Sequence, residues 1–265
     1  MNAVNWLLLN QSKGYWIAFL VAFFAAAVAE SLRPARVITG VEKRWARHGA
    51  LFVVGTVAVG VVLRFSPVAV ALAFSDSPHG LLNRLPFWPA FVLTILALDL
   101  VHYVTHWTYH HVGWLWKVHS VHHSDVDYDV STAVRFHPIE YLLGGGSTLA
   151  AIALLAAPPI AVLVSELITV VTNLAVHANA NYPPALERVL RTVFVTPAIH
   201  RIHHAEDFGD QNANYGQSLV IWDRLFATFR ARAASQNFAT GLEESRGCDT
   251  LSIHHLLTAP FRRSK

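Results

Sequence analysis

The chain has 265 residues, of which 54% are apolar and only 14% are charged. An ordinary soluble domain carries about 25% charged residues, so this composition argues against a water-soluble enzyme and predicts a lipid bilayer as the main solvent. The single cysteine, Cys248, excludes an internal disulfide and a thiolate metal cluster. The net charge of +3 comes from scattered basic residues without interleaved aromatics, which argues against nucleic acid as a partner.

Four long apolar stretches follow one another along the chain, and a membrane-spanning helix needs about 20 such residues. Residues 14–29 carry no charge, whereas residues 49–75, 85–116 and 141–186 carry one each, at Arg64, Asp99 and Glu166. The last stretch is long enough to cross twice, with its turn at Pro158-Pro159 because proline interrupts a helix. The sequence therefore predicts an all-α, polytopic membrane bundle with four or five crossings.

The first two stretches each raise a question. Ala27-Val28-Ala29 resembles a signal-peptidase site, but the basic residues follow the apolar run instead of preceding it, so we expect a retained helix. Arg64 would be costly in the middle of a bilayer, so we expect the second stretch to be broken into two pieces near Pro67.

Basic residues also orient the chain. Residues 33–47 carry five arginines and lysines and are expected on the cytoplasmic side, since positively charged loops stay inside. The second stretch then runs outward, and the helix that begins near Phe87 returns. The hairpin at Pro158-Pro159 leaves and comes back, and the C-terminal region stays inside. Every histidine motif thus falls at one cytoplasmic interface, and we expect the membrane to be a bacterial inner membrane.

A histidine followed three and four residues later by two more occurs twice. The two triplets are His119, His122 and His123 in HSVHH, and His200, His203 and His204 in HRIHH. Residues three and four apart share one face of a helix, so each triplet is predicted to aim at one point.

Two further segments carry a pair with helical spacing, His106 with His110 and Asn173 with His177. Neutral imidazole is the commonest biological metal ligand and suits iron, copper, zinc and nickel. A transition metal has about six positions, some of which must stay open for chemistry, so nine histidines and one asparagine fit two ions better than one. The pattern predicts a dinuclear centre in a helical, histidine-rich cap on the cytoplasmic side.

The other histidines are expected to play lesser parts. His111 is predicted to turn away from the face of the neighbouring pair, and His102 to be either a ligand or a hydrogen-bond partner of one. His137 precedes a proline and is expected to close a turn or brace the site. Four isolated histidines are expected to be ordinary surface or interfacial residues without a role: His48, His79, His254 and His255.

Carboxylates are expected around the ligands, because the outer N–H group of a metal-bound imidazole usually donates to one. The sequence does not tell which of them do so. The candidates are Asp99, Asp125, Asp127, Glu140, Glu206, Asp207 and Asp223.

A series of motifs in fixed order gives the chain a family resemblance. The motifs are, in order, DLVHYVTHWTYHH, LWKVHSVHHSD, STAVRFHPIE, HANANYPP and TPAIHRIHH, followed by NYGQSLVIWDRLFATF. Together they resemble the fatty acid hydroxylase and sterol desaturase superfamily of integral-membrane di-iron oxidases. The resemblance covers roughly residues 99–229, with a weaker echo up to PFRR near the C-terminus. It implies metal ligands at His106, His110, His119, His122, His123, His177, His200, His203 and His204, with Asn173 as a tenth.

Three positions depart from the family's pattern. Trp107 stands where arginine is frequent, Asn212 where aspartate is common, and Ala227 where glycine is usual. None of the three removes a ligand, so they bear on substrate and partner more than on the metal site.

The resemblance and the ligand set together favour an enzyme that uses two iron ions, O₂ and electrons from a separate donor protein. Its reaction would hydroxylate or desaturate a C–H bond of a lipid such as a fatty acyl chain or a sterol. Catalytic residues beyond the metal ligands are not identified. We expect one functional unit with N-terminal transmembrane helices at residues 1–98, a catalytic region at 99–235 that contains the hairpin 141–177, and a C-terminal tail at 236–265.

Other functions stay open at the level of sequence. A membrane cytochrome would leave both triplets unexplained. A zinc-dependent membrane hydrolase or a non-catalytic metal-binding membrane protein would use similar ligands, because the affinity order of metals does not insist on iron. The absence of an HExxH motif argues against a zinc protease.

Overall fold

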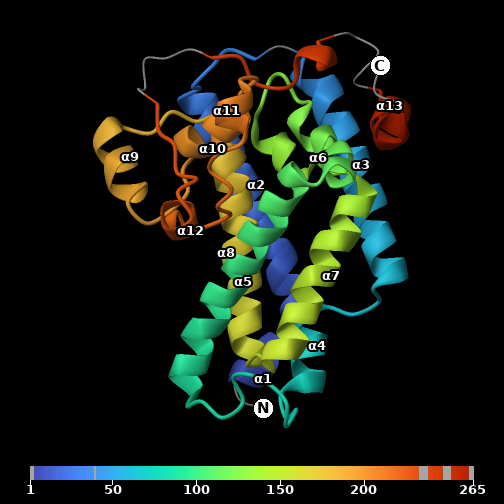
Figure 1. Ribbon diagram of the computed structural model, residues 1–265, viewed down its shortest axis with the longest axis vertical. Helices are drawn as coiled ribbons and strands as arrows, with labels where there is room; N and C mark the ends of the chain where they lie inside the picture. The colour runs from blue at the N-terminus through green and yellow to red at the C-terminus, as the bar shows by residue number, and fades with distance from the viewer. Residues whose placement is uncertain (1–2, 39, 233–237, 247–251, 263–265) are drawn as a thin grey trace.

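The computed structural model describes residues 3–38, 40–232, 238–246 and 252–262, and no β-sheet forms among them. Most of this part of the chain is helical, as predicted (Figure 1). The helices of the bundle are α1 (Ala3–Leu9), α2 (Gln11–Leu32), α3 (Val41–Val62), α4 (Pro67–Phe74), α5 (Phe87–His111), α7 (Pro138–Leu155) and α8 (Pro159–His177).

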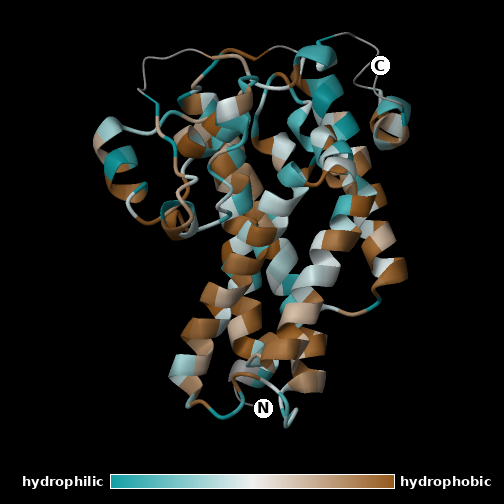
Figure 2. Cartoon of the chain, in the orientation of Figure 1, coloured by the Kyte–Doolittle hydropathy of each residue, from teal (hydrophilic) through white to brown (hydrophobic). Residues whose placement is uncertain are grey.

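Five stretches of the described chain are long and apolar enough to cross a membrane: α2, the pair α3 and α4, α5, α7 and α8. They run alternately up and down the long axis of the molecule (Figure 1). Their lower parts are almost uniformly apolar, whereas hydrophilic residues gather at the upper end (Figure 2). The predicted polytopic bundle is therefore confirmed, with five candidate crossings.

The second crossing is broken, as expected from Arg64 and Pro67. α3 ends at Val62 and α4 begins at Pro67, and Arg64 between them has a φ of 61°. Ser66 caps α4, because its side chain accepts a hydrogen bond from the backbone N–H of Ala69. The break lets α4 pack against both α7 and α8 at the lower end of the bundle.

The long fourth stretch forms the predicted hairpin. α7 ends in Ala156, which has a left-handed φ of 48°, and α8 starts at Pro159. Proline has no N–H to donate, so it is well suited to the first turn of α8. α8 then packs along α2 and α5 and returns His177 to the upper end, where the other histidine motifs lie.

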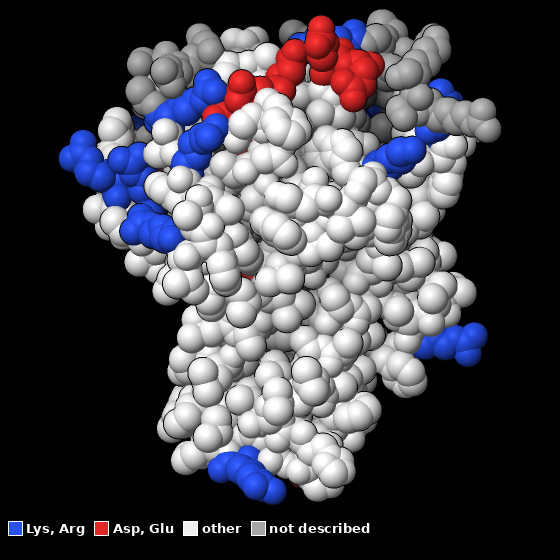
Figure 3. Space-filling view, viewed as in Figure 1, with Lys and Arg blue, Asp and Glu red and all other residues white. Residues whose placement is uncertain are grey.

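Short helices cover the upper end and form what we call the cap. It consists of α6 (Gly113–His123), η1 (Val130–Val134), α9 (Pro184–Leu190), α10 (Pro197–His203), α11 (Phe208–Gln211) and α12 (Ile221–Leu225). Further along the chain lie η2 (Glu243–Ser245), α13 (Ile253–Thr258) and η4 (Ala259–Phe261). On the face seen in Figure 3, charged side chains gather at the upper end, whereas the sides of the bundle carry few charged side chains.

A buried ionic network ties the cap to α3. Arg44 donates to Asp125 at 2.7 and 3.2 Å and to Asp129 at 2.7 Å, and all three side chains are almost fully buried. Arg135 donates to the Val121 carbonyl and to Ser124, at the end of α6. Charges removed from water must be paired, so this network fixes where α6 lies relative to α3.

His48 belongs to this network, and the expectation that it is an ordinary surface residue was wrong. It is 1% exposed, its Nδ1 lies 2.7 Å from the Ser131 hydroxyl, and its Nε2 lies 3.2 Å from the Arg135 guanidinium. The spacing contained a signal, because Arg44 and His48 are four residues apart and so share one helix face.

Candidate metal centre

Nine histidines meet at the upper end of the bundle and form two groups of potential metal ligands. One ligand atom from each member lies within 4.8 Å of those of the others in its group. The five-histidine group consists of His106, His110, His119, His123 and His203, and the four-histidine group of His122, His177, His200 and His204. The structure thus brings together all nine histidines singled out from the sequence, from α5, α6, α8 and α10 with its C-cap residue.

Each triplet is divided between the two groups, so the prediction that a triplet aims at one point was wrong. On α6, His119 and His123 face the five-histidine group and His122 faces the other. On α10 the division is reversed, since His203 alone joins the five-histidine group. The reason is rotational: a helix turns about 100° per residue, which keeps positions i and i+4 together and sends i+3 to the side.

Hydrogen bonds to the outer ring nitrogen orient four of the nine imidazoles. The Tyr215 carbonyl accepts from His106 Nδ1 at 2.9 Å, and the Ala213 carbonyl from His203 Nδ1 at 2.7 Å. A Glu140 carboxylate oxygen lies 2.6 Å from His119 Nδ1. The Asn173 carbonyl lies 2.7 Å from His177 Nδ1. With Nδ1 engaged, Nε2 is the nitrogen left to bind a metal, as in most histidine metal sites.

The inward nitrogens fit a metal ion by their lack of partners. A buried Nε2 without any hydrogen-bond partner occurs on six of the nine histidines: His106, His110, His119, His123, His203 and His204. Buried polar atoms are normally satisfied, so a cluster of unsatisfied ones calls for an explanation such as an ion. The other three histidines meet through Nε2, since His177 Nε2 lies 3.2 Å from His122 Nε2 and 3.1 Å from His200 Nε2.

Those two distances fit a shared ion. Nitrogens bound about 2.1 Å from one metal and set roughly at right angles lie about 3 Å apart. Burial, reinforced by the neighbouring imidazoles, holds the pKa values of His122, His123, His200 and His204 well below their usual range, and lowers that of His203 to about 3. These rings are therefore neutral at physiological pH, the form that binds metals.

Of the seven candidate carboxylates, Glu140 contacts a histidine of the groups. Two others hold the segment that carries Tyr215: Asp223 accepts from the Tyr215 and Gly216 N–H groups, and Asp99 accepts from the Ser218 and Leu219 N–H groups. Asp99 faces this segment two turns away from His106 and has no hydrogen bond to a histidine of the groups among the described residues.

The remaining four carboxylates bind elsewhere. Asp125 and Asp127 face Arg44, Glu206 pairs with Arg246, and Asp207 caps α11. None of these four has a hydrogen bond to a histidine of the groups within the described residues. They stabilise the cap instead of the metal ligands.

The flanking histidines and Asn173 lie near the groups without joining them. His102 Nε2 lies 3.4 Å from the Thr148 hydroxyl, and His137 caps α7 and contacts the Leu257 carbonyl. His137 therefore closes a turn, which is one of its two predicted roles, whereas the role of His102 stays a prediction. His111 is exposed and outside both groups, as predicted. The Asn173 side chain donates to the Ala133 carbonyl at 2.9 Å, so its role as a ligand stays a prediction.

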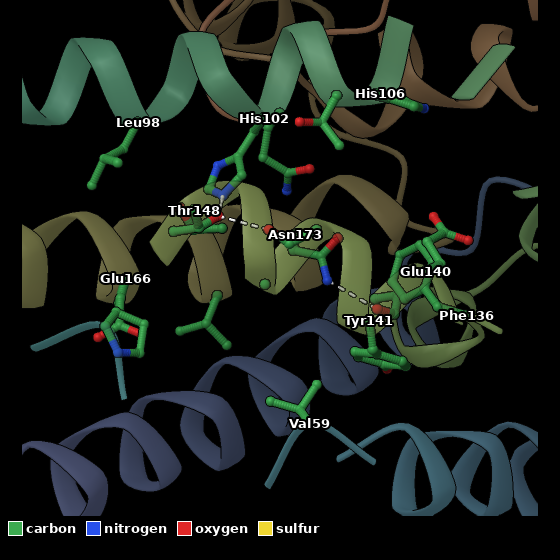
Figure 4. Close-up of a pocket in the computed structure, with 18 of the residues that line it drawn as sticks. Val59, Leu98, His102, His106, Phe136, Glu140, Tyr141, Thr148, Glu166 and Asn173 are labelled. Atoms are coloured by element: carbon green, nitrogen blue, oxygen red, sulfur yellow. Dashed lines mark hydrogen bonds between the residues drawn. The ribbon is translucent and has the colours of Figure 1, made fainter. Parts of the chain in front are cut away.

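A cavity of about 440 Å³ leads from the histidines into the membrane-spanning bundle. Its upper end is lined by Glu140 and by members of both groups, namely His106, His119, His122, His177 and His200. The wall below them carries many apolar side chains, among them Leu98 (Figure 4), Leu149, Ile152, Val162 and Val170. An elongated apolar cavity that opens on a polar cluster suits the acyl or isoprenoid part of a lipid.

A second pocket of about 370 Å³ adjoins the five-histidine group from the cap side. It is polar and is lined by His110 and Trp116 together with Glu206, Phe208, Gln211, Asn212 and residues 242–244. The Trp116 ring lies against His110, with the ring centroids 4.9 Å apart. The two pockets therefore reach the histidines through different members, the apolar cavity at five of them and the polar pocket at His110.

Comparisons with known proteins agree with this site. The chain is 32% identical over 167 residues to an ornithine lipid hydroxylase of Rhizobium tropici, which is 62% of this chain and 50% of that protein. It is 27% identical over 226 residues to an alkylglycerol monooxygenase of Caenorhabditis elegans (83% and 41%), and 32% identical over 139 residues to that of Homo sapiens (51% and 29%). The chain thus spans half or less of these relatives' length, and no solved structure matches it significantly.

A family model adds the broader assignment. Residues 91–228, more than half of the chain, match the model described as fatty acid hydroxylase. The match spans α5 to α12 and so includes all nine histidines of the two groups. By this match the chain is a member of the fatty acid hydroxylase family.

Proposed function

We propose that this protein is a membrane-bound di-iron oxygenase that hydroxylates a lipid. In the reaction, one C–H bond of the lipid and O₂ give one C–OH group and one molecule of water. Balance requires two electrons and two protons, and we assign the electrons to a separate donor protein. The alternative reaction is desaturation at the same position, in which the lipid loses two hydrogens instead of gaining one oxygen.

The observation that carries the proposal is the meeting of the nine-histidine cluster with an apolar cavity. Both groups line the same cavity, so a lipid that occupies it has its reacting carbon next to both. The five-histidine group would hold one iron and the four-histidine group the other, and such ions supply the activation of O₂. The hydroxylase and monooxygenase names of the relatives support oxygen insertion over hydrolysis.

The protein's own residues position the substrate and exclude water. The apolar wall holds the chain of the lipid against the histidines, which lowers the entropic cost of bringing carbon and oxidant together. Glu140 holds the ring of His119 in place from the cavity side. The positively charged segment 33–47 supports a cytoplasmic location for the cap, in a bacterial inner membrane.

The proposal can be tested with purified protein and with cells. We expect about two irons per chain by elemental analysis, and lipid extracts from expressing cells that gain one oxygen by mass spectrometry. Growth under ¹⁸O₂ should place the label in the new hydroxyl group. Bound zinc with no change in the lipids under iron and oxygen supply would contradict the proposal and favour a zinc hydrolase or a non-catalytic metal protein.

A further inference from the structure

Glu166 is an ionisable residue in the middle of α8, inside a membrane-spanning stretch that is otherwise uncharged. Its side chain lines the apolar cavity (Figure 4). A carboxyl group at this depth is costly to keep in a bilayer, and such residues usually face a cavity and mark a functional site.

Glu166 is half-buried at the wall of the cavity, and it differs from other acids of the bundle and the cap in having no partner. Glu30, Asp99, Asp125 and Asp223 each accept at least two hydrogen bonds from the protein. Glu166 has no hydrogen bond and no ion pair among the described residues, although it lines a cavity where hydroxyl groups are available. A carboxyl group that faces an apolar cavity without a partner in the protein is suited to a donor on a ligand.

The position of Glu166 along α8 sets the distance between this side chain and the histidines. Eleven residues separate it from His177, and a helix rises about 1.5 Å per residue, so the two side chains are roughly 16 Å apart along the axis. Figure 4 shows Glu166 and Leu98 near one end of the cavity and His106 and Glu140 near the other. Roughly a dozen carbon–carbon bonds in a zigzag chain would span this distance.

We propose that Glu166 binds a hydroxyl group of the lipid substrate and thereby sets which carbon faces the histidines. The substrate class is a lipid in which a hydroxyl and the reacting carbon are separated by an apolar run of about this length. A neutral hydroxyl fits better than an ammonium group, because a charged group would lose much more hydration in the cavity. This inference rests on the proposed function for the reacting carbon, but not for the binding itself.

Binding to the metal-free protein in detergent tests the role of Glu166 without any chemistry. The probes are deuterated 1-dodecanol and deuterated dodecane, measured by equilibrium binding and corrected for uptake into protein-free micelles. We expect wild-type protein to prefer the alcohol by up to about tenfold, the usual worth of one hydrogen bond. Glu166→Leu should abolish this preference, whereas Glu166→Gln should keep most of it because its amide oxygen still accepts.

Thr148→Val is the matched control. It removes a hydroxyl from the same cavity, but one that already donates to the Gly144 carbonyl, so the preference for the alcohol should not change. Equal binding of alcohol and alkane by wild-type protein, or a preference that survives in Glu166→Leu, would overturn the assignment. Glu166→Leu should keep the helix, since leucine is favourable in a membrane span.

The iron-loaded enzyme then links binding to reaction. Wild-type protein should oxygenate a hydroxylated lipid at one carbon, whereas the product that Glu166→Leu forms should carry the oxygen at several carbons, as read by fragmentation mass spectrometry. A single unchanged position in the variant would refute the positioning role. If wild-type protein oxygenates no lipid, the proposed function fails, while the dodecanol comparison still decides what Glu166 binds.

Discussion

The two histidine groups differ in what they face. The apolar cavity is lined by members of both groups, whereas the polar pocket reaches the five-histidine group at His110 and is lined by no member of the other group. On the proposed function, a lipid in the cavity would approach both groups, whereas polar reactants in the second pocket would reach the five-histidine group first. The difference shows how one cluster of histidines can be reached through an apolar and a polar pocket at different members.

The groups also differ in what holds their rings. In the five-histidine group, three rings have a hydrogen bond at the outer nitrogen, namely those of His106, His119 and His203. In the four-histidine group His177 alone has such a bond, but all four members are buried. Hydrogen bonds orient the first group, and close packing orients the second.

The largest effect is expected where one change affects both groups. Asp125 follows α6 directly and binds Arg44, so Asp125→Asn should weaken the network that positions α6, which contributes to both groups. Removing one partner of a buried pair costs about 3–5 kcal/mol. We expect a clear fall in unfolding temperature by calorimetry and an equal loss of metal from both groups.

The same network predicts a pH dependence. Burial alone would raise the pKa of Asp125, but Arg44, His48 and Arg135 hold it well below its usual range. A depressed pKa in the folded state stabilises the protein above about pH 4, where the unfolded side chain is ionised, and this stabilisation is lost as pH falls further. Asp76→Asn, in an exposed loop, is the control, and equal acid sensitivity of the two variants would exclude Asp125 as the cause.

A smaller effect should separate the two groups. His177→Ala leaves three imidazoles in its group, whereas His110→Ala leaves four in the other. We expect His177→Ala to lose one equivalent of iron and at least about 100-fold in product, more than the usual loss for an outer partner, and His110→Ala to lose less. Elemental analysis and lipid mass spectrometry measure both, with the exposed His79→Ala as control. Equal losses would show that ligand number does not distinguish the groups.

The smallest effect concerns the outer support of a single ring. Glu140→Ala removes the carboxylate that holds His119, and outer partners contribute about 10–100-fold to metal affinity or activity. Glu140→Gln should fall near wild type because its amide oxygen still accepts. Iron affinity measured by competition with a chelator tests this order, and an identical affinity in the alanine variant would disprove the supporting role.

Much of the fold could be predicted from local properties of the sequence. The uncharged runs gave the crossings, and the costly Arg64 beside Pro67 gave the break between α3 and α4. Pro158-Pro159 predicted the turn of the hairpin. The basic segment 33–47 predicted that all histidine motifs lie at the same end of the bundle. These features depend on solvation and on proline geometry, which act within a few residues.

The details of the site depended on contacts between distant segments. Helical spacing predicted that the nine histidines meet at one end, but only the way in which α5, α6, α8 and α10 come together decides which ring belongs to which group. Asp99 carried no sign that it would hold residues 218–222, and the carbonyl that orients His106 belongs to a backbone position with no sequence signal. Glu166 did carry a signal, as a lone charge in an apolar run.

Because each triplet is divided between the groups, α6 and α10 fix the distance between the two groups. Neighbouring residues on one rigid helix, His122 beside His123 and His203 beside His204, face different groups, with their rings nearly perpendicular at 89° and 88°. On the proposed function, the separation of the two ions would thus be set by helix geometry and not by loops. Loops and cavity walls could then diverge to accept other lipids while the spacing of the two groups stays the same.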